Sequence, residues 1–306
     1  RNQLMYQGSS MRAREESDFL IPSDPWFRPV HLQFGPDGAL YIADFYNRII
    51  GHYEVDLNHP GRDRKRGRIW KVVFTGHKGR RDATVVSKGQ AGEPQNLDGM
   101  LRRLKGANRV QARVIEKQIF ELLRQDTHGA AQLGRALLKF CHVGGDENTQ
   151  AVISATNVLR MLGRIDLSVR VVNQLYASDA MNCHLFQMLA DDGADDIAAD
   201  EMRGMLRLGL AAASPMVRRF AAMTAAKRVE VDVTPELIQL LNEAGSSSDP
   251  FLVHAVKIAL REQCKNEPDR FLRVTERVTA PCIPAFAQIC LAVKTPGAAE
   301  FILQNL

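Results

Sequence analysis

The sequence is poor in long apolar runs, and this limits the classes of protein to which it can belong. No apolar segment approaches the about 20 residues that a helix needs to cross a bilayer. The chain opens with RNQLMYQGSS, which contains no initiator methionine, no apolar signal core and no cleavage pattern. We therefore expect an interior piece of a longer protein, whose location a missing signal does not reveal.

Cysteine pairs at short spacing are also absent. The tripeptide Phe140-Cys141-His142 lacks the first cysteine of a haem-attachment CxxCH motif, because residue 138 is leucine. The sequence therefore predicts no haem attachment site, no zinc site and no disulfide framework in this chain. The cysteines lie in apolar helical segments, where buried thiols are common. We expect all five in the core: Cys141, Cys183, Cys264, Cys282 and Cys290.

Positive charge is concentrated near the start of the chain. Residues 1–105 carry 18 basic and 12 acidic residues, a net charge of +6, whereas the remainder carries 22 and 23, a net charge of −1. Most of the excess lies in HPGRDRKRGRIWKVVFTGHKGRR, at residues 59–81. Such a segment suits a solvated loop and linker, or binding to acidic polysaccharide, anionic lipid or nucleic acid. Nucleic acid is disfavoured, because the segment has no readout motif and no interleaved aromatic residues.

The N-terminal region contains a series of short strand signals. Residues 30–34 alternate in polarity, and the turn GPDG at residues 35–38 separates them from a second strand at residues 39–44. Further strands are expected at residues 48–55 and 68–74. Four short antiparallel strands joined by turns are what one blade of a β-propeller requires. Such a blade needs neighbouring blades on both faces, so we expect them outside this chain.

Helical periodicity dominates after a polar, glycine-containing linker at about residues 76–96. Helix starts are marked by Ser214 and Asp249, each followed by proline, and more loosely by Asn108. Amphipathic segments are expected near residues 110–123, 133–141, 151–162, 169–176, 185–189, 202–210, 217–226, 237–241, 252–260, 271–278, 283–293 and 298–306. Uneven intervals near the HEAT period predict a HEAT-like α-solenoid. Its core is expected to include Met202, Met205, Met216 and Met223.

These signals predict a mixed, mainly α chain, in which one terminal β-propeller blade of antiparallel strands precedes a HEAT-like α-solenoid. Residues 1–75 are expected to form the C-terminal part of a β-propeller, with the last blade at about 29–75. A linker at 76–96 and a helical repeat domain at 97–306 follow.

The residues of the expected blade resemble an NHL-type propeller repeat. The pattern P-x-x-L-x-F-x-P-D-G-x-L-Y-I-A-D-x-x-N-x-R-I occurs from Pro29 to Ile49, with one residue fewer before the Arg-Ile pair. The longer string DPWFRPVHLQFGPDGALYIADFYNRIIGHYEVDLNHPGRDRKRGRIWKVVF resembles the last propeller blade of membrane-bound dehydrogenase-like proteins of planctomycetes and verrucomicrobia. In that family, a propeller related to glucose and sorbosone dehydrogenases precedes HEAT-like repeats and a c-type cytochrome domain. His31 stands where that family often has an acidic residue, which weakens a ligand role there.

The resemblance implies an oxidoreductase parent in the periplasm or cell envelope. It also implies a quinone cofactor and haem c in parts of the parent outside this chain, since the chain itself shows no cofactor or metal site. Upstream blades would carry most of a substrate site. No catalytic residue can therefore be assigned in this chain.

The candidate site residues fall into a structural and a ligand-binding group. Asp37 and Gly38 are expected to shape a turn, and Arg48 is expected to brace a neighbouring strand. Asp44 and Asn47 either fix the blade corner through backbone hydrogen bonds or contact a ligand such as calcium. The candidate ligand-binding residues are Arg28, His31, Arg62, Arg64 and Arg66.

The ligand-binding group is chosen by position and chemistry. Arg28 and His31 lie just before or on the first strand, where they face either the propeller mouth or the adjacent blade. The alternating Arg62, Arg64 and Arg66 suit a carboxylate, sulfate or phosphate held by bidentate hydrogen bonds. They equally suit ion pairs with acids of the helical region, such as Asp195, Asp196, Asp200 and Glu201.

Two functions remain open on the sequence. In the first, the parent oxidises a sugar or alcohol and passes electrons to its haem domain, while the helices of this inactive piece act as a scaffold. In the second, the chain is a non-catalytic scaffold that binds protein or acidic glycan through the helical face and the arginine-rich loop. The expected partners are thus a protein, the adjacent blades and haem domain of the parent, or an acidic glycan.

Overall fold

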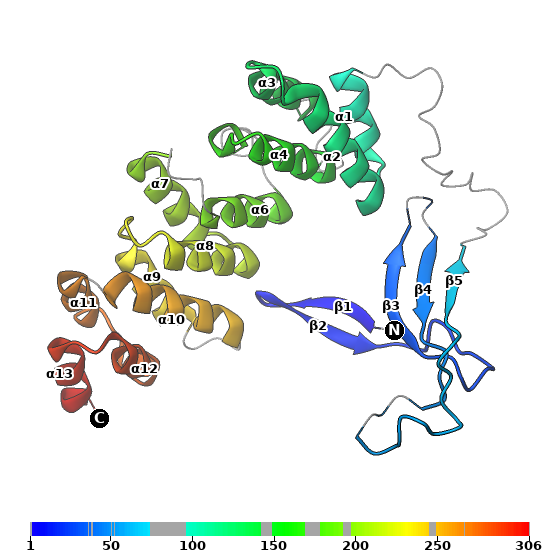
Figure 1. Ribbon diagram of the computed structural model, residues 1–306. Helices are drawn as coiled ribbons and strands as arrows, with labels where there is room; N and C mark the ends of the chain where they lie inside the picture. The colour runs from blue at the N-terminus through cyan, green and yellow to red at the C-terminus, as the bar shows by residue number, and fades with distance from the viewer. Residues whose placement is uncertain are drawn as a thin grey trace. The chain divides into compact units, whose positions relative to one another are not determined.

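The structure, a computed structural model, describes residues 2–35, 37, 39–49, 51, 53–73, 96–141, 149–168, 178–191, 197–244, 249–265 and 267–305. It is mainly helical, with small antiparallel sheets near the N-terminus (Figure 1). The chain divides into two compact units. The first unit contains residues 16–122, and the second joins residues 2–15 to residues 123–306. Apart from Asn96, the expected linker lies outside the described residues.

A three-stranded antiparallel sheet forms the strand part of the first unit. Its strands are β3 (Pro29–Phe34), β4 (Leu40–Asp44) and β5 (Arg68–Val72), in the order β3-β4-β5. The strand expected at residues 48–55 is wrong, because the described residues of that stretch form no strand. The Arg62 guanidinium binds backbone carbonyls within this stretch, so they are not available to a neighbouring strand.

Both faces of this sheet carry exposed apolar side chains. In the register, Leu32 lies opposite Ile42, which lies opposite Trp70. Leu32 and Trp70 therefore share one face, and they are 59% and 42% exposed. On the opposite face Ile69 is 77% exposed. Ile42 is nevertheless buried, so the centre of the sheet is covered while its flanks are not.

A hairpin that the sequence analysis missed belongs to the second unit. Its strands are β1 (Asn2–Gln7) and β2 (Ser10–Glu15), joined by the two residues Gly8 and Ser9. Gly8 has a φ of +58°, which suits the tight turns that join adjacent strands. The Gly-Ser pair was therefore a usable hairpin signal.

The remaining described elements are helices. They are α1 (Leu97–Lys105), α2 (Arg109–Leu123), α3 (Gly129–Cys141), α4 (Thr149–Met161), α6 (Asp179–Ala190), α7 (Ala199–Leu210), α8 (Pro215–Lys227), α9 (Thr234–Ala244), α10 (Pro250–Lys265), α11 (Pro268–Thr275), the short 3₁₀ helix η2 (Ala280–Cys282), α12 (Ile283–Val293) and α13 (Pro296–Asn305). The predicted helical segments are confirmed, except that residues 169–176 lie outside the described residues. None of the described helices is long and apolar enough to cross a membrane.

The helices of the second unit form two rows. One row stacks α4, α6, α8, α10 and α12 in succession, as Figure 1 shows for α6, α8 and α10. The other row contains α7, α9, α11 and α13, which pack against the first. Helices α8 and α10 bury their apolar stripes between neighbours in both rows, which explains the alternation.

Buried polar side chains connect successive helices of the first row. Arg228, directly after α8, donates Nε to the Leu189 carbonyl at 2.7 Å and Nη2 to the Asp191 carbonyl at 2.6 Å. Gln263 of α10 is 1% exposed and donates Nε2 to the Ala225 carbonyl at 2.9 Å. Because the last carbonyls of a helix have no partner within it, these side chains satisfy acceptors at the ends of α6 and α8.

The core of the second unit contains aromatic rings and thiols. The ring centroids of Phe271 and Phe286 are 5.7 Å apart, and those of Phe286 and Phe301 are 5.0 Å apart. Cysteines 183, 264, 282 and 290 are buried, as predicted, whereas the side chain of cysteine 141 lies outside the described residues. Burial raises the pKa of Cys264 to about 12 and the pKa of Cys290 to about 11, so these thiols stay protonated.

The methionine prediction holds only in part. Met202 and Met205 are buried in the core, as predicted. Met216 is half-buried, and Met223 is 45% exposed. Core placement is therefore wrong for Met223, because its side of α8 faces an open hollow rather than another helix.

The turn of the β1–β2 hairpin docks at the start of α10. Asp249 caps α10 by accepting the Leu252 amide at 3.1 Å, and it also accepts the Ser9 amide at 2.6 Å and the Ser9 hydroxyl at 2.9 Å. Arg219 of α8 donates to the Ser9 carbonyl at 3.0 Å. A Cβ at Gly8 would lie 2.4 Å from the Asp249 carboxylate, so this contact requires glycine.

Candidate functional site

The carboxylate of Asp44 is the most heavily hydrogen-bonded group of the three-stranded sheet. Asp44 ends β4 and is 3% exposed. Its Oδ1 accepts the backbone amides of Arg28 and Tyr46, each at 2.8 Å. Its Oδ2 accepts Trp70 Nε1 at 3.0 Å and Arg68 Nε at 3.1 Å. Four donors therefore saturate this carboxylate, and no lone pair faces an open site.

The charge of Asp44 is stabilised by these partners. Burial by itself raises the pKa of Asp44, but the hydrogen bonds from Arg28, Trp70 and Tyr46 and the nearby Arg68 charge outweigh it. The net effect holds the pKa below its ordinary value, so the group is ionised at neutral pH. In this geometry Asp44 fixes a corner of the sheet through hydrogen bonds, and both of its oxygens already have protein donors.

Arg68 extends the cluster around Asp44. Its Nη2 lies 2.8 Å from Asp24 Oδ2, and its guanidinium lies 3.6 Å from the ring centroid of Tyr46 and 5.0 Å from that of Trp70. The arginine therefore ties the segment before β3 to β4 and β5. Arginine suits this task because its flat cation pairs with carboxylates and stacks on aromatic rings. Bracing of the strands was expected from Arg48, which is instead exposed.

Asn47 and Asp37 also act within the sheet region. Asn47 is 2% exposed and donates its amide to the Asp63 carbonyl at 2.9 Å. Asp37 accepts Tyr41 Oη at 2.9 Å and Lys71 Nζ at 2.7 Å. The Lys71 hydrogen bond, followed by those of Tyr41 and Ala39, lowers the pKa of Asp37 to about 2. The other predicted turn residue, glycine 38, lies outside the described residues.

The three arginines of the predicted anion site are bonded within their own loop. Arg62 donates Nε to the Asp56 carbonyl at 3.0 Å, and its Nη2 reaches two further loop carbonyls. Arg64 donates Nη2 to Asn58 Oδ1 at 2.8 Å. Arg66 pairs with the carboxylate of the neighbouring aspartate 63 at 2.5 Å. The acids proposed as alternative partners at residues 195 and 196 lie outside the described residues.

Arg28 and His31 do not converge with the loop arginines on one described site. Arg28 donates Nη1 to the carbonyls of Pro25 at 3.0 Å and Phe27 at 2.8 Å. His31 is exposed on β3, with Nε2 3.5 Å from Gln33 Oε1. Among the described residues, no group of three histidine, cysteine, aspartate or glutamate side chains could hold a metal ion.

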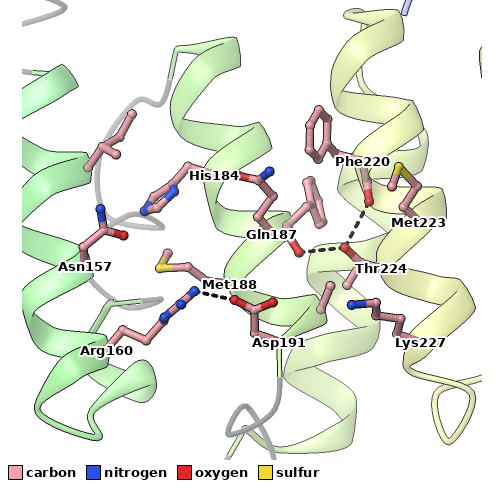
Figure 2. Close-up of a pocket in the computed structure, with 13 residues that line it drawn as sticks. Asn157, Arg160, His184, Gln187, Met188, Asp191, Phe220, Met223, Thr224 and Lys227 are labelled. Atoms are coloured by element: carbon pink, nitrogen blue, oxygen red, sulfur yellow. Dashed lines mark hydrogen bonds and ion pairs between the residues drawn. The ribbon is translucent and has the colours of Figure 1, made fainter. Parts of the chain in front are cut away.

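A pocket that the sequence analysis missed lies on the first row of helices. It has a volume of about 510 Å³ and lies between α4, α6 and α8 (Figure 2). We call it the α4–α6–α8 pocket. Its polar lining consists mainly of Asn157, Arg160, His184, Gln187, Asp191 and Lys227. Figure 2 shows these side chains converging on the hollow, with Phe220 and Met223 on its α8 side.

The pocket arises from helix periodicity. Each helix contributes side chains three, four or seven residues apart. On α4 these are Asn157 and Arg160. On α6 they are His184 and Gln187, with Asp191 directly after its last residue. This spacing places them on one helix face. The sequence signal was therefore present, but no spacing within one helix shows which other helix faces it.

One ion pair crosses the pocket floor. Arg160 Nη1 of α4 pairs with Asp191 Oδ2 beyond the end of α6. Lys227 of α8 is exposed and forms no ion pair with another described residue. The amides of Asn157 and Gln187 likewise have no hydrogen-bond partner among the described residues. The pocket therefore presents one unpaired cation beside two unpaired amides.

His184 is oriented by a hydroxyl group. The Thr156 Oγ1 lies 3.0 Å from the Val152 carbonyl, 2.9 Å from the Ile153 carbonyl and 3.0 Å from His184 Nε2. The contact holds the imidazole ring in place through Nε2, and the tautomer of the ring decides which of the two groups donates.

The charge state of His184 follows from its surroundings. Burial lowers the pKa of His184, and the Arg160 charge lowers it further, against a smaller opposing effect of Asp191. The imidazole is therefore neutral at neutral pH and does not add to the positive charge of the pocket.

Comparison with known proteins gives a match over the strand region. A family model described as a domain of unknown function (DUF7133) matches residues 1–76. No curated protein and no solved structure matches the chain. The matched residues contain the β1–β2 hairpin and the three-stranded sheet and end before the first described helix. The strand region is thus the part of this chain that is similar to a family recognised in other proteins.

Proposed function

We propose that this chain joins the last blade of a β-propeller to a HEAT-like helical scaffold, as part of a dehydrogenase-like parent protein. The observation that carries the proposal is the exposure of apolar side chains on both faces of the three-stranded sheet. Phe34 and Leu32 are each 59% exposed on one face, and Ile69 is 77% exposed on the other. A propeller blade buries both of its faces against the two adjacent blades.

The internal bracing of the sheet supports the same proposal. The corner around Asp44 is fully hydrogen-bonded, so the sheet holds its own strands together without needing a ligand there. What the sheet lacks is cover for its faces. Upstream blades of the parent are the proposed cover, since sheets stacked face to face bury such side chains.

The helical region is proposed to act as the scaffold of the parent. Two rows of helices joined by buried polar contacts form an extended surface, and such stacks commonly present binding surfaces. In this proposal the parent oxidises a sugar or alcohol and passes electrons to a c-type haem domain, as the resemblance of the blade implies. A quinone cofactor would belong to the upstream blades.

The blade proposal is tested by placing a charge on the sheet face. Phe34→Glu is expected to leave the stability of this chain unchanged, because residue 34 already faces solvent. In the full-length parent the same change is expected to cost about 2 kcal/mol or more, because it would bury a carboxylate between blades. Leu303→Glu on α13, at a position 84% exposed, is the matched control. Equal stability of the Phe34→Glu parent and the control parent would contradict the proposal.

The oxidoreductase assignment has its own test. The purified full-length parent is expected to reduce an electron-acceptor dye when an aldose or an alcohol is supplied. Spectra of the parent should also show haem c. A parent loaded with cofactor that reduces no dye with any sugar or alcohol would contradict the assignment and leave the blade proposal standing.

Binding of acidic glycan through the arginine-rich loop is the weaker proposal. Arg62 and Arg64 already donate to carbonyls and an amide oxygen of the loop, and Arg66 pairs with Asp63. A sulfated polysaccharide would have to replace these contacts. The helical face is the stronger candidate for a binding role, because its pocket contains polar groups that have no partner among the described residues.

A further inference from the structure

We propose that the α4–α6–α8 pocket binds an extended, acidic segment of polypeptide across the three helices. The proposal rests on the scaffold role of the helical region but not on the oxidoreductase assignment. It is carried by three features of the pocket: a pair of unpaired amides on adjacent helices, an excess cation, and an apolar side.

The two amides match the backbone of an extended chain. Asn157 lies on α4 and Gln187 on α6, and each has both a donor and an acceptor without a partner among the described residues. A peptide unit has an N–H group that can donate to the side-chain oxygen and a carbonyl that can accept from the side-chain NH₂ group. Packed helices lie about 8–10 Å apart, and three residues of extended chain span about 10 Å. Side chains on adjacent helices therefore suit peptide units about three residues apart in a chain that crosses the helices.

The charge of the pocket selects an acidic segment. Arg160 and Asp191 neutralise each other, and Lys227 is left as a cation with no described counterion. His184 is held at Nε2 by the Thr156 hydroxyl, and its neutral ring adds no charge to the pocket. A carboxylate of the bound segment would thus find its partner at Lys227.

The apolar side of the pocket supplies contact area. Phe220 and Met223 line it from α8, and Met223 is 45% exposed although methionine is usually buried. Flexible, polarizable methionine side chains adapt to varied ligand shapes. An apolar residue near the carboxylate of the segment would cover Met223. Small dicarboxylates can reach the cation and accept hydrogen bonds from the amide NH₂ groups, but they have no donor for the amide oxygens and little apolar surface for this side.

The test uses the whole chain and a fluorescein-labelled peptide of about nine residues, enough to cross three helices. The peptide contains a repeated Glu-Ser-Leu sequence, and a matched peptide has glutamine in place of glutamate. Fluorescence anisotropy measures binding. We expect the glutamate peptide to bind at least about fivefold more tightly than the glutamine peptide, and the difference to shrink at high salt. Equal binding of the two peptides would overturn the proposal.

Pocket variants should change the affinity in opposite directions. Lys227→Glu is expected to weaken binding about tenfold, because an attraction becomes a repulsion. Asp191→Asn is expected to strengthen binding several-fold, since it frees Arg160 and removes a negative charge. Lys265→Glu, at an exposed position at the end of α10, is the matched control and should bind as the unchanged chain does. A loss of binding in both Lys227→Glu and Asp191→Asn would overturn the proposal.

The amide contacts have a separate test. Asn157→Ala and Gln187→Ala are each expected to weaken binding of the glutamate peptide about three- to tenfold, since each removes hydrogen bonds to its backbone. Unchanged far-UV circular dichroism would show that the helices are intact. Full competition by free glutarate at concentrations similar to the peptide would identify a small-carboxylate site and overturn the peptide proposal. If the pocket binds no acidic peptide in these assays, the blade proposal and its Phe34→Glu test still stand.

Discussion

The three-stranded sheet and the helical rows treat apolar surface in opposite ways. In the helical rows, Phe286 and Leu206 are completely buried, and α8 and α10 have neighbours from both rows. In the sheet, Phe34 and Ile69 remain mostly exposed although the strands are well formed. The described helices therefore bury large apolar side chains between them, whereas the flanks of the sheet leave such side chains exposed.

The same difference appears in the use of polar side chains. In the helical rows, buried Arg228 and Gln263 reach across to carbonyls of the preceding helix, so polar contacts hold separate elements together. In the sheet, Asp44 collects donors from its own strand neighbours. The hydrogen bonds to Asp44 thus hold the strands together, although apolar side chains on both faces of the sheet are exposed.

The largest expected effect comes from truncating one phenylalanine in each region. Phe286→Ala should lower the free energy of unfolding by about 3–5 kcal/mol, because it leaves a cavity between Phe271 and Phe301. Phe34→Ala should change it by less than about 1 kcal/mol, because its ring is already exposed. Urea denaturation followed by circular dichroism and tryptophan fluorescence measures both. Equal losses of unfolding free energy in the two variants would contradict the proposed difference between the two regions.

The next effect is a loss of stability in the sheet alone, which can be measured separately from the stability of the helices. Both tryptophans, Trp26 and Trp70, lie in the first unit, so their fluorescence reports on the sheet while far-UV circular dichroism reports mainly on helices. Asp44→Asn should cost the sheet about 2–3 kcal/mol, because an NH₂ group would face two hydrogen-bond donors. Only the fluorescence transition should move. The exposed Asp18→Asn is the control, and a shift of the helical transition would count against independent regions.

A smaller effect is expected from the polar contacts between helices. Gln263→Leu should cost about 2 kcal/mol, because the Ala225 carbonyl at the end of α8 and its neighbours lose their donor. Gln239→Leu on the exposed side of α9 should cost less than about 0.5 kcal/mol. Thermal unfolding followed at 222 nm compares the two. If both substitutions had the same cost, the buried network would not be what stabilises the stacking.

The docked hairpin should respond to a single methyl group. Gly8→Ala places a Cβ against Asp249 and a non-glycine residue at a positive φ, which should cost about 1–2 kcal/mol of docking. Trypsin should then cleave after Arg12 and Arg14 faster, while the thermal transition of the helices stays unchanged. Gly106→Ala, where a Cβ meets nothing within 4 Å, is the control. Unchanged cleavage would show that the hairpin is not held by its turn.

The smallest effect concerns pH. The folded protein lowers the pKa of His184 through burial and the Arg160 charge, so folding favours the neutral ring. This contribution is complete above the unfolded value of about 6.5 and is lost as the pH falls through the folded pKa. The unchanged chain should therefore lose more thermal stability between about pH 7 and pH 5 than His184→Gln does. His254→Gln, an exposed control, should follow the unchanged chain.

The sequence allowed good predictions where local chemistry decides the structure. Helical periodicity and the caps at Asn108 and Asp249 placed the helices, and Asn108 Oδ1 indeed accepts the Gln111 amide at 2.9 Å. The turn carboxylate of Asp37 and the corner carboxylate of Asp44 were likewise interpreted from local rules that the geometry follows. The helix caps take their partners within a few residues along the chain, whereas Asp37 and Asp44 also take partners from the distant strand β5.

One prediction failed where a side chain competes with a local pattern. The strand expected at residues 48–55 had suitable residues, but Arg62 binds its carbonyls. The alternating arginines each have an acceptor in their own loop, and their binding of an anion stays a prediction. Neither arrangement follows from residue type, because both depend on how the loop folds back on itself.

Local residue patterns specify the elements themselves: helices with their apolar stripes, turns with their capping carboxylates, and strands with alternating faces. Which faces meet is set by tertiary packing. It brought Ser9 to Asp249, 240 residues away, and placed His184 and Gln187 beside Arg160 in one pocket. The physical reason is that periodicity assigns a side chain to a face, whereas the neighbour of that face is chosen by packing along the whole chain.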